Sequence, residues 1–346
     1  MMIRHNVKLY ERLKLEYQNS DIKPSQYWKN YVHSICNEIE KNGFEYYGKK
    51  YILNSGGFGD TPKITPRPLI RKIFKIPFIY KFLEKKYVYY QLKKIRKNFF
   101  YHLKNDDFSK VELLEFISNK IDKKTRNSNI IRTVEVNSNL IPHSYTKGSI
   151  CLDIIEKIIE FQNLDLSIND LFKNNVVDIG GGVGSIIHSF YEYKLMKSYK
   201  PSSKFILLEQ FPVSYIAKQS LEYFSDDNIE MIDLNTNNSS SKILVCQNTS
   251  LKDINNLNVS LYFNSSSFQE MDKKQVEEYC DFMEKNKAHN CYLACFLYPS
   301  NKSNNSDKEV LKILNKKFKL IGWDKNYFDK YQGGIQGNLY LYSLTS

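Results

Sequence analysis

Apolar residues in the second half of the chain form short, continuous runs that alternate with segments of helical periodicity. Such runs are typical of buried strands, and their alternation with helices indicates a parallel sheet covered by helices on both faces. The pattern predicts strands at about 175–179, 204–209, 242–247, 259–264 and 290–298. It predicts connecting helices near 184–197, 212–224, 273–286 and 307–317. Two final apolar segments, 318–323 and 339–344, flank a glycine-rich turn and predict a terminal antiparallel hairpin.

The first 45 residues follow a helical pattern. Apolar positions recur at helical spacing at Leu9, Leu13 and Tyr17. A second helix is expected from about Pro24 to Asn42, with Gly43 as its C-terminal stop. It begins with the aromatic cluster Tyr27–Tyr31. Such rings pack in a core or stack on the C–H face of a sugar, and core packing is the commoner role.

Charge divides the chain, whose net charge is +12, into two parts. Residues 1–150 contain 29 Lys and Arg against 14 Asp and Glu, whereas residues 151–346 contain 21 against 24. All seven arginines lie at or before Arg132, so a bidentate arginine contact to a phosphate or carboxylate has to come from the first part. We therefore predict a basic, mainly helical region over 1–150, which binds substrate, acts as a lid or binds a surface. A Rossmann-like α/β domain is predicted over 151–346.

Two segments of the N-terminal region have open roles. Residues 54–68 contain three glycines and three prolines, which is typical of a loop, either a lid over an active site or a linker. Residues 67–104 contain twelve Lys and Arg and one acid, Glu84, interleaved with aromatics. Such a face binds nucleic acid, lies on an anionic membrane or is simply solvated. The scarcity of arginine disfavours nucleic acid.

Several classes of protein are disfavoured by what the chain lacks. No apolar run reaches the ~18 residues of a membrane span, and the first residues lack the apolar core of a secretion signal. A cytoplasmic location is expected, with peripheral contact to the inner face of the membrane as an alternative. The six cysteines form no C-x-x-C pair or zinc-type cluster, so we expect buried free thiols.

A glycine-rich turn follows the first predicted strand, in Val176-Val-Asp-Ile-Gly-Gly-Gly-Val-Gly-Ser185. Glycines let the chain turn sharply and let a ligand lie against bare backbone amides. The dinucleotide pattern G-x-G-x-x-G is not met, because Ser185 occupies its last position. The pattern D-x-G-x-G-x-G instead resembles the first motif of S-adenosylmethionine-dependent methyltransferases.

Acids and amides follow the predicted strands, and ligands of such sheets lie beyond the carboxyl ends of the strands. These residues should therefore converge on one ligand. Asp178 suits the ammonium group of the cofactor, directly or through water, and Glu209 can accept both ribose hydroxyls. Gln247 or Asn248 can meet the adenine edge. The predicted cofactor-binding residues are Asp178, Gly180, Gly181, Gly182, Gly184, Glu209, Gln210, Gln247, Asn248 and Asn264.

Methyl transfer to a hydroxyl requires alignment of two reactants and removal of a proton. Glu270, after the fourth predicted strand, is the expected base or holds a sugar ring, whereas Asp272 is expected to cap the next helix. His143 is the favoured proton acceptor from the N-terminal region, although a lone histidine is more often a plain hydrogen-bonding residue. Glu135 is a weaker candidate. No carboxylate cluster suggests a metal, and we expect none.

Three motifs resemble those of the bacterial sugar O-methyltransferases, which belong to the class I S-adenosylmethionine-dependent methyltransferases. They are Asp178-Ile-Gly-Gly-Gly-Val-Gly184, Phe205-Ile-Leu-Leu-Glu-Gln-Phe-Pro212, and Phe263-Asn-Ser-Ser-Ser-Phe-Gln-Glu-Met271 with Gln275-Val-Glu-Glu-Tyr279. The resemblance spans about 175–300, with weaker similarity at Tyr27-Trp28 and 133–160. That family often has Asp-Leu-Pro after the second strand, where this chain has Glu209-Gln-Phe-Pro212. The resemblance implies methylation of a sugar in a surface polysaccharide or its nucleotide-linked precursor.

Two other functions stay open at this stage. The basic stretch 67–104 fits an RNA methyltransferase, whose signature would be steeply salt-dependent RNA binding. A non-catalytic methyltransferase-fold scaffold, docked on a membrane or a partner, would bind no cofactor. The leading expectation is a sugar or nucleotide-sugar as substrate, and the oligomeric state is left open.

Overall fold

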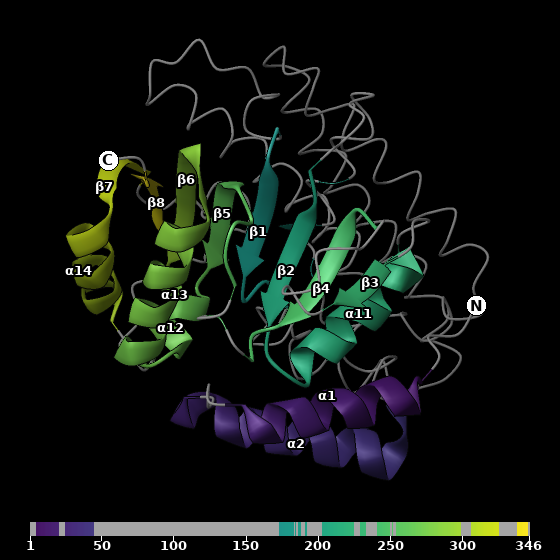
Figure 1. The fold of residues 1–346 in the computed structure, drawn as a ribbon. Helices are drawn as coiled ribbons and strands as arrows, with labels where there is room; N and C mark the ends of the chain where they lie inside the picture. The colour runs from purple at the N-terminus through teal and green to yellow at the C-terminus, as the bar shows by residue number, and fades with distance from the viewer. Residues whose placement is uncertain are drawn as a thin grey trace, which may run out of the picture.

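The computed structural model describes residues 5–20, 25–44, 173–182, 184, 186–187, 191, 203–224, 229–232, 241–249, 251, 254–298, 306–324 and 338–344. In these residues an eight-stranded sheet has the order β3-β4-β2-β1-β5-β6-β8-β7 (Figure 1). The strands are β1 (Asn175–Ile179), β2 (Phe205–Glu209), β3 (Ile229–Ile232), β4 (Ile243–Gln247), β5 (Val259–Ser265), β6 (Lys287–Leu297), β7 (Lys319–Asp324) and β8 (Asn338–Ser343). The helices are α1 (Val7–Asn19), α2 (Gln26–Asn42), α11 (Val213–Phe224), α12 (Ser267–Glu270), α13 (Lys273–Asn286) and α14 (Asp307–Lys317).

The predicted fold class is confirmed. Strands β1 to β6 pair in parallel, whereas β8 is antiparallel to both β6 and β7. The predicted terminal hairpin is therefore the β7–β8 pair. The sequence pattern missed β3, which pairs only with β4 among the described strands. Its four residues, Ile-Glu-Met-Ile, are too few to give a clear signal.

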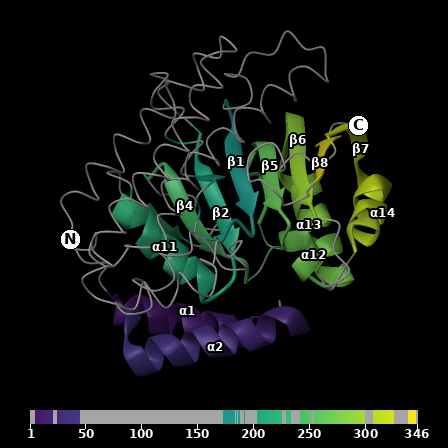
Figure 2. The same cartoon turned by 180° about the vertical axis from the view of Figure 1, so that it is seen from behind.

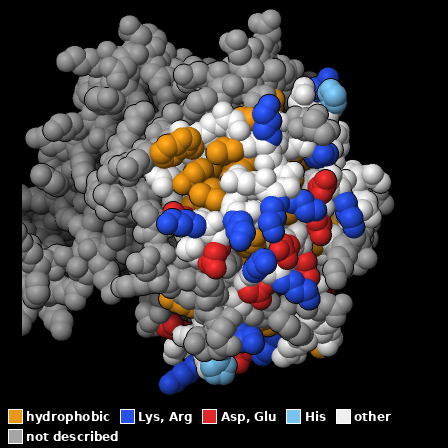
Figure 3. Space-filling model, turned by 90° about the vertical axis from the view of Figure 1, so that its left-hand side faces the viewer, with side chains coloured by type: hydrophobic (Ala, Val, Ile, Leu, Met, Phe, Trp, Pro, Cys, Tyr) orange, Lys and Arg blue, Asp and Glu red, His pale blue; other side chains and the backbone are white. Residues whose placement is uncertain are grey.

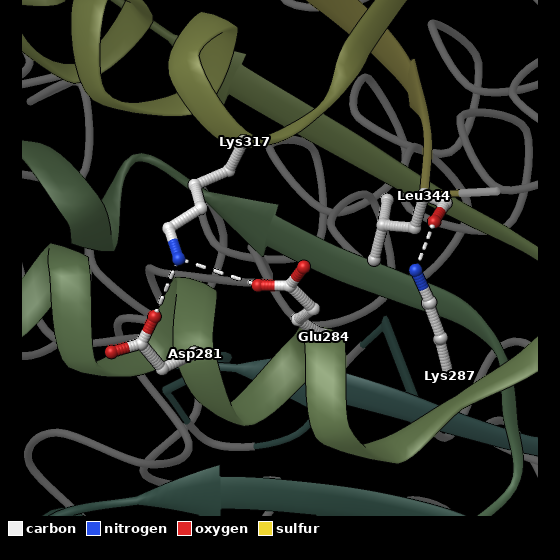
Figure 4. A network of polar contacts seen from close by, with 5 residues as sticks. All are labelled: Asp281, Glu284, Lys287, Lys317 and Leu344. Carbon is white, nitrogen blue, oxygen red and sulfur yellow. Dashed lines mark hydrogen bonds and ion pairs between the residues drawn. The ribbon is translucent and has the colours of Figure 1, made fainter. Parts of the chain in front are cut away.

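Helices α13 and α14 pack on the sheet, with Val276, Met283 and Leu314 in a core shared with β1, β2 and β5. Both helices begin with a capping box, and the one at Asp272 confirms the predicted cap. The two helices are also joined by Lys317, whose Nζ lies 2.9 Å from Asp281 Oδ1 and 3.3 Å from Glu284 Oε2 (Figure 4). Because these groups are exposed, the ion pairs contribute little stability.

The N-terminal helix pair, α1 and α2, lies across the carboxyl ends of the strands, as both ribbon views show (Figures 1 and 2). Tyr10 and Leu13 of α1 and Ile35 and Ile39 of α2 form a core with residues of α11 and its N-terminal flank. The predicted helix over 24–42 and its glycine stop are confirmed, with φ +81° at Gly43. The pair is thus bound to the edge of the sheet where ligands of this fold class lie.

Strand β7 forms one lateral edge of the described sheet and carries exposed apolar side chains. Leu320 and Trp323 are 40% and 54% exposed, and Trp323 stacks on Tyr340 of β8 with ring centroids 6.4 Å apart. On the face seen from this side, lysines and acids are interspersed beside an apolar patch (Figure 3). This described surface is therefore not dominated by one sign of charge.

Several predictions concern residues outside the described ones. These are the loop 54–68, the basic stretch 67–104, Glu135, His143 and the boundary near residue 150. None of the helices in the described segments has the length and hydropathy of a membrane span.

Candidate active site

The glycine turn after β1 is packed tightly on one side and open on the other. A Cβ on Gly181 would lie 2.0 Å from Asp178 Oδ2, and one on Gly180 would lie 2.3 Å from Ser267 Oγ. Gly182 has φ +61°, and a Cβ there would meet nothing within 4 Å. The turn therefore presses against the sheet at Gly180 and Gly181 while its Gly182 side faces free space.

Glu209, the last residue of β2, faces this turn. Its Oε2 accepts a hydrogen bond from the Gly182 N–H at 3.0 Å, and its Oε1 accepts one from the Gln210 N–H at 2.9 Å. Burial raises the pKa of Glu209 to about 8, against the lowering effect of the two amide donors. The negative charges of Asp178 and Glu270 raise it further. The predicted pair of glycine turn and acid thus lies on one side of the sheet.

Asp178 is fully buried within β1, where its carboxylate packs against Gly181. Gly184, at φ +80°, packs instead against α11, because a Cβ there would lie 2.9 Å from Leu221. Asp178 and Glu209 are close enough for one charge to act on the other. Both acids therefore border the same glycine turn.

The predicted amides after β4 make two different kinds of contact. Gln247 Nε2 donates to the Leu13 carbonyl of α1 at 3.1 Å, so this nitrogen is engaged by the N-terminal helix pair. Asn248 donates from its backbone to the Glu209 carbonyl at 3.2 Å and from Nδ2 to the Tyr279 hydroxyl at 2.8 Å. Asn248 thus stands beside Glu209, as the sequence predicts.

Asn264 has a structural role, which differs from the predicted contact with a ligand. The side chain is fully buried, and Nδ2 donates to the Ile179 carbonyl at 2.9 Å and to Ser267 Oγ. Its Oδ1 accepts from the Phe268 N–H at 3.3 Å. Asn264 therefore holds the end of β5 against the end of β1 and starts α12.

Glu270, the last residue of α12, meets the first turn of α2. The Trp28 side chain hydrogen-bonds to the Glu270 carboxylate, and Ser25 Oγ donates to the Glu270 carbonyl at 2.5 Å. Burial raises the pKa of Glu270 to about 7, while the Trp28 bond acts in the opposite direction. A carboxyl group that titrates near neutral pH is suited to accept a proton.

Two side chains at this edge were not predicted in their observed roles. Trp28 belongs to the aromatic cluster for which the sequence leaves core packing and sugar stacking open; it is half-buried and bonded to Glu270, while its neighbour Tyr31 is 41% exposed. Tyr298 follows β6, and burial raises its pKa, with a smaller contribution from the negative charge of Glu270. The position of Tyr298 at a carboxyl strand end is a usable signal, whereas the aromatic cluster around Trp28 does not reveal its bond to Glu270.

The described residues contain no group of three or more His, Cys, Asp or Glu side chains that could hold a metal ion. The five cysteines in these segments are free, and all but the partly buried Cys36 are buried, which confirms the expectation for them. His143, the other predicted proton acceptor, lies outside the described ranges.

No protein-family model matches the sequence, and no curated protein matches it. The pyocyanin biosynthetic protein PhzM is a similar solved structure, at 11% identity and a TM-score of 0.37, and the match covers 64% of this chain and 61% of PhzM. The mitomycin 7-O-methyltransferase MmcR matches at 12% identity and a TM-score of 0.38, over 67% of each chain. The N-methyltransferase NodS from Bradyrhizobium japonicum WM9 matches at 15% identity and a TM-score of 0.35, over 56% of this chain and 97% of NodS. Similarities this low do not identify an activity or a substrate.

Proposed function

We propose that this protein is an S-adenosylmethionine-dependent O-methyltransferase that acts on a sugar hydroxyl. The observation that carries the proposal is the hydrogen bond from the Gly182 N–H to Glu209 at 3.0 Å. It joins the glycine turn after one strand to the acid after the next, at the carboxyl edge of a mostly parallel sheet. That edge is where sheets of this class hold their ligands.

The residues at this edge fit the proposed cofactor. Gly182 offers a face that a Cβ would fill, and the buried Glu209 carboxylate is an acceptor for ribose hydroxyls. Asp178, behind the turn, supplies the negative charge that favours an ammonium group. When bound, S-adenosylmethionine supplies a methyl group on a positively charged sulfur, and transfer of that group leaves a neutral thioether.

Glu270 is the proposed base for the acceptor hydroxyl. The acceptor oxygen loses its proton to the Glu270 carboxylate as it gains the methyl carbon. With a pKa of about 7, Glu270 holds a substantial charged fraction at neutral pH and binds the proton it receives. Because the charge of Glu270 acts on Glu209, the two acids lie within electrostatic range of each other. Donor and acceptor can therefore meet between them.

The sugar is proposed from motif resemblance. The segment Ser267–Met271 resembles that of the bacterial sugar O-methyltransferases, and it contains Glu270. A carboxylate is also a natural acceptor for sugar hydroxyls. The substrate would be a surface polysaccharide or its nucleotide-linked precursor.

Calorimetry with S-adenosylmethionine tests the cofactor. We expect Glu209→Ala to weaken binding by roughly tenfold or more, since a buried acceptor for two hydroxyls is lost. Glu222→Gln on the exposed side of α11 is the matched control and should bind as wild type does. Equal affinity in Glu209→Ala and wild type would refute the assignment.

Transfer of a labelled methyl group tests the acceptor. Nucleotide-sugars, polysaccharide fragments and RNA should be offered separately to the full chain, and we expect label in the sugars. Mass spectrometry of glycans from cells that lack the gene should show the loss of a mass increment equal to one CH₂ group. Label in RNA alone would replace the sugar with the rival substrate.

A further inference from the structure

The N-terminal helix pair is joined to the carboxyl edge by polar bonds at separate points. Gln247, the last residue of β4, donates from Nε2 to the Leu13 carbonyl at 3.1 Å, and Ser20 Oγ donates to the Thr249 carbonyl at 3.0 Å. The third bond runs from Ser25 Oγ to the Glu270 carbonyl, across 245 positions of sequence. The start of α2 is thus placed directly at α12.

Ser25 and Trp28 attach to the same residue in different ways. They are three positions apart at the start of a helix, a spacing that brings two side chains to one face. Ser25 bonds to the backbone of Glu270, and Trp28 bonds to its carboxylate. The first turn of α2 therefore constrains both the position of Glu270 and the direction of its side chain.

The bond from Trp28 affects the charge of a carboxylate, that of Glu270, to which two other titratable groups respond. Glu209 at the end of β2 and Tyr298 after β6 both interact electrostatically with Glu270, whose negative charge raises their pKa values. The indole N–H of Trp28 is a donor that favours the charged form of the carboxylate. Without such a donor, partial burial favours the protonated form of a carboxylate more strongly, so a smaller fraction can accept a proton.

We propose that Trp28 is a positioning residue that orients the Glu270 carboxylate and keeps it charged, so that α2 forms the acceptor side of the active site. This inference rests on the methyltransferase function proposed above. It gives the N-terminal helix pair a part in the reaction, through one side chain that touches the base. On the cofactor side, Glu209 is held instead by the backbone amides of Gly182 and Gln210.

The first test is the pH dependence of kcat/KM in Trp28→Phe, which removes the N–H donor and keeps an aromatic ring. Because the charged Glu270 carboxylate loses a hydrogen-bond donor, the acid limb of the kcat/KM profile should shift to higher pH by roughly one to two pH units. Turnover near pH 7 should fall about tenfold and recover at higher pH, with cofactor affinity unchanged. Lys14→Met, which removes the ion pair to Glu40 within the same helix pair, should keep the wild-type profile.

The second test does not depend on turnover. The midpoint of Glu270 is followed by carboxyl ¹³C NMR in the full chain, with Glu270→Gln used to assign its signal. We expect a higher midpoint in Trp28→Phe, and Trp28→Leu tests the same contact if the Phe variant does not fold. An unchanged midpoint overturns the role of Trp28 even if the protein is a methyltransferase. If the titration midpoint of Glu270 rises in Trp28→Phe but the acid limb of the kcat/KM profile does not move, Glu270 is not the base of the reaction. Trp28 then has no role in the reaction either.

Discussion

The two acids at the carboxyl edge are held by different means. Glu209 accepts hydrogen bonds from two backbone amides, those of Gly182 and Gln210, which belong to the strand ends beside it. Glu270 is bonded by a side chain from α2, far away in the sequence. A backbone N–H donor is kept in almost any substitution of its residue, whereas a side-chain donor is removed by a single substitution. In the proposed function, the cofactor side therefore depends on backbone donors, and the acceptor side depends on a side-chain donor that a single substitution removes.

The largest effect that separates the two acids is expected in Glu270→Gln. Turnover should fall by about 10²- to 10⁴-fold, the usual contribution of a general base, while calorimetry shows unchanged cofactor affinity. Glu277→Gln, an exposed position on α13, serves as the control. Unaltered turnover would show that the acid does not take part in the reaction.

Gly182→Ala should break the cofactor side by steric means. Its φ of +61° resembles the +81° of Gly43, and a Cβ at either position meets nothing within 4 Å in the protein itself. Both Ala variants should thus lose roughly 1–3 kcal/mol of stability from strain, since residues with a Cβ rarely adopt a positive φ. Only Gly182→Ala should also lose cofactor affinity, by about 100-fold, because close backbone approach to a ligand needs glycine. Similar affinities in the two variants would mean that no ligand lies against Gly182.

The pH dependence of stability should identify the buried acid of the cofactor side. Burial raises the folded-state pKa of Glu209 from 4.5 to about 8, so the folded protein keeps a proton that the unfolded chain loses. The resulting stability is complete below about pH 4.5 and is lost as the pH rises through 8, with a total on the order of a few kcal/mol. Denaturant unfolding of Glu209→Gln should give a flatter curve over this range. A slope identical to that of wild type would contradict the raised pKa of this buried carboxyl group.

The smallest effect is expected far from both acids. Lys317→Met removes the exposed ion pairs to Asp281 and Glu284 seen in Figure 4. We expect a loss below about 1 kcal/mol in denaturant unfolding and no change in cofactor affinity. A change in affinity would mean that α14 influences the edge from the opposite end of the sheet.

Sequence reasoning predicted what depends on local pattern. Strand runs, the terminal hairpin, the Asp272 cap and the Gly43 stop follow from spacing and from single residues, and all are confirmed. The glycine turn and Glu209 were predicted to meet because parallel strands end at one edge.

Contacts between distant parts of the chain could not be predicted in this way. The bond between Trp28 and Glu270 depends on how the N-terminal helix pair docks, and periodicity contains no information about docking. The place of Asn264 at the end of a strand predicts a ligand contact, but its amide donates instead to the adjacent Ile179 carbonyl and Ser267 hydroxyl. A residue at the right edge can serve the fold instead of the ligand, and only packing distinguishes the two.

The attachment of α2 to Glu270 has a consequence for how such a protein can diversify. Ser25 and Trp28 hold Glu270 although they do not belong to the sheet. If Glu270 is the base, as we propose, substitutions at the start of α2 can therefore change its reactivity toward different acceptors during evolution. The cofactor side, around Gly182 and Glu209, would not need to change with those substitutions. Homologues with different acceptors should then differ first within that helical turn.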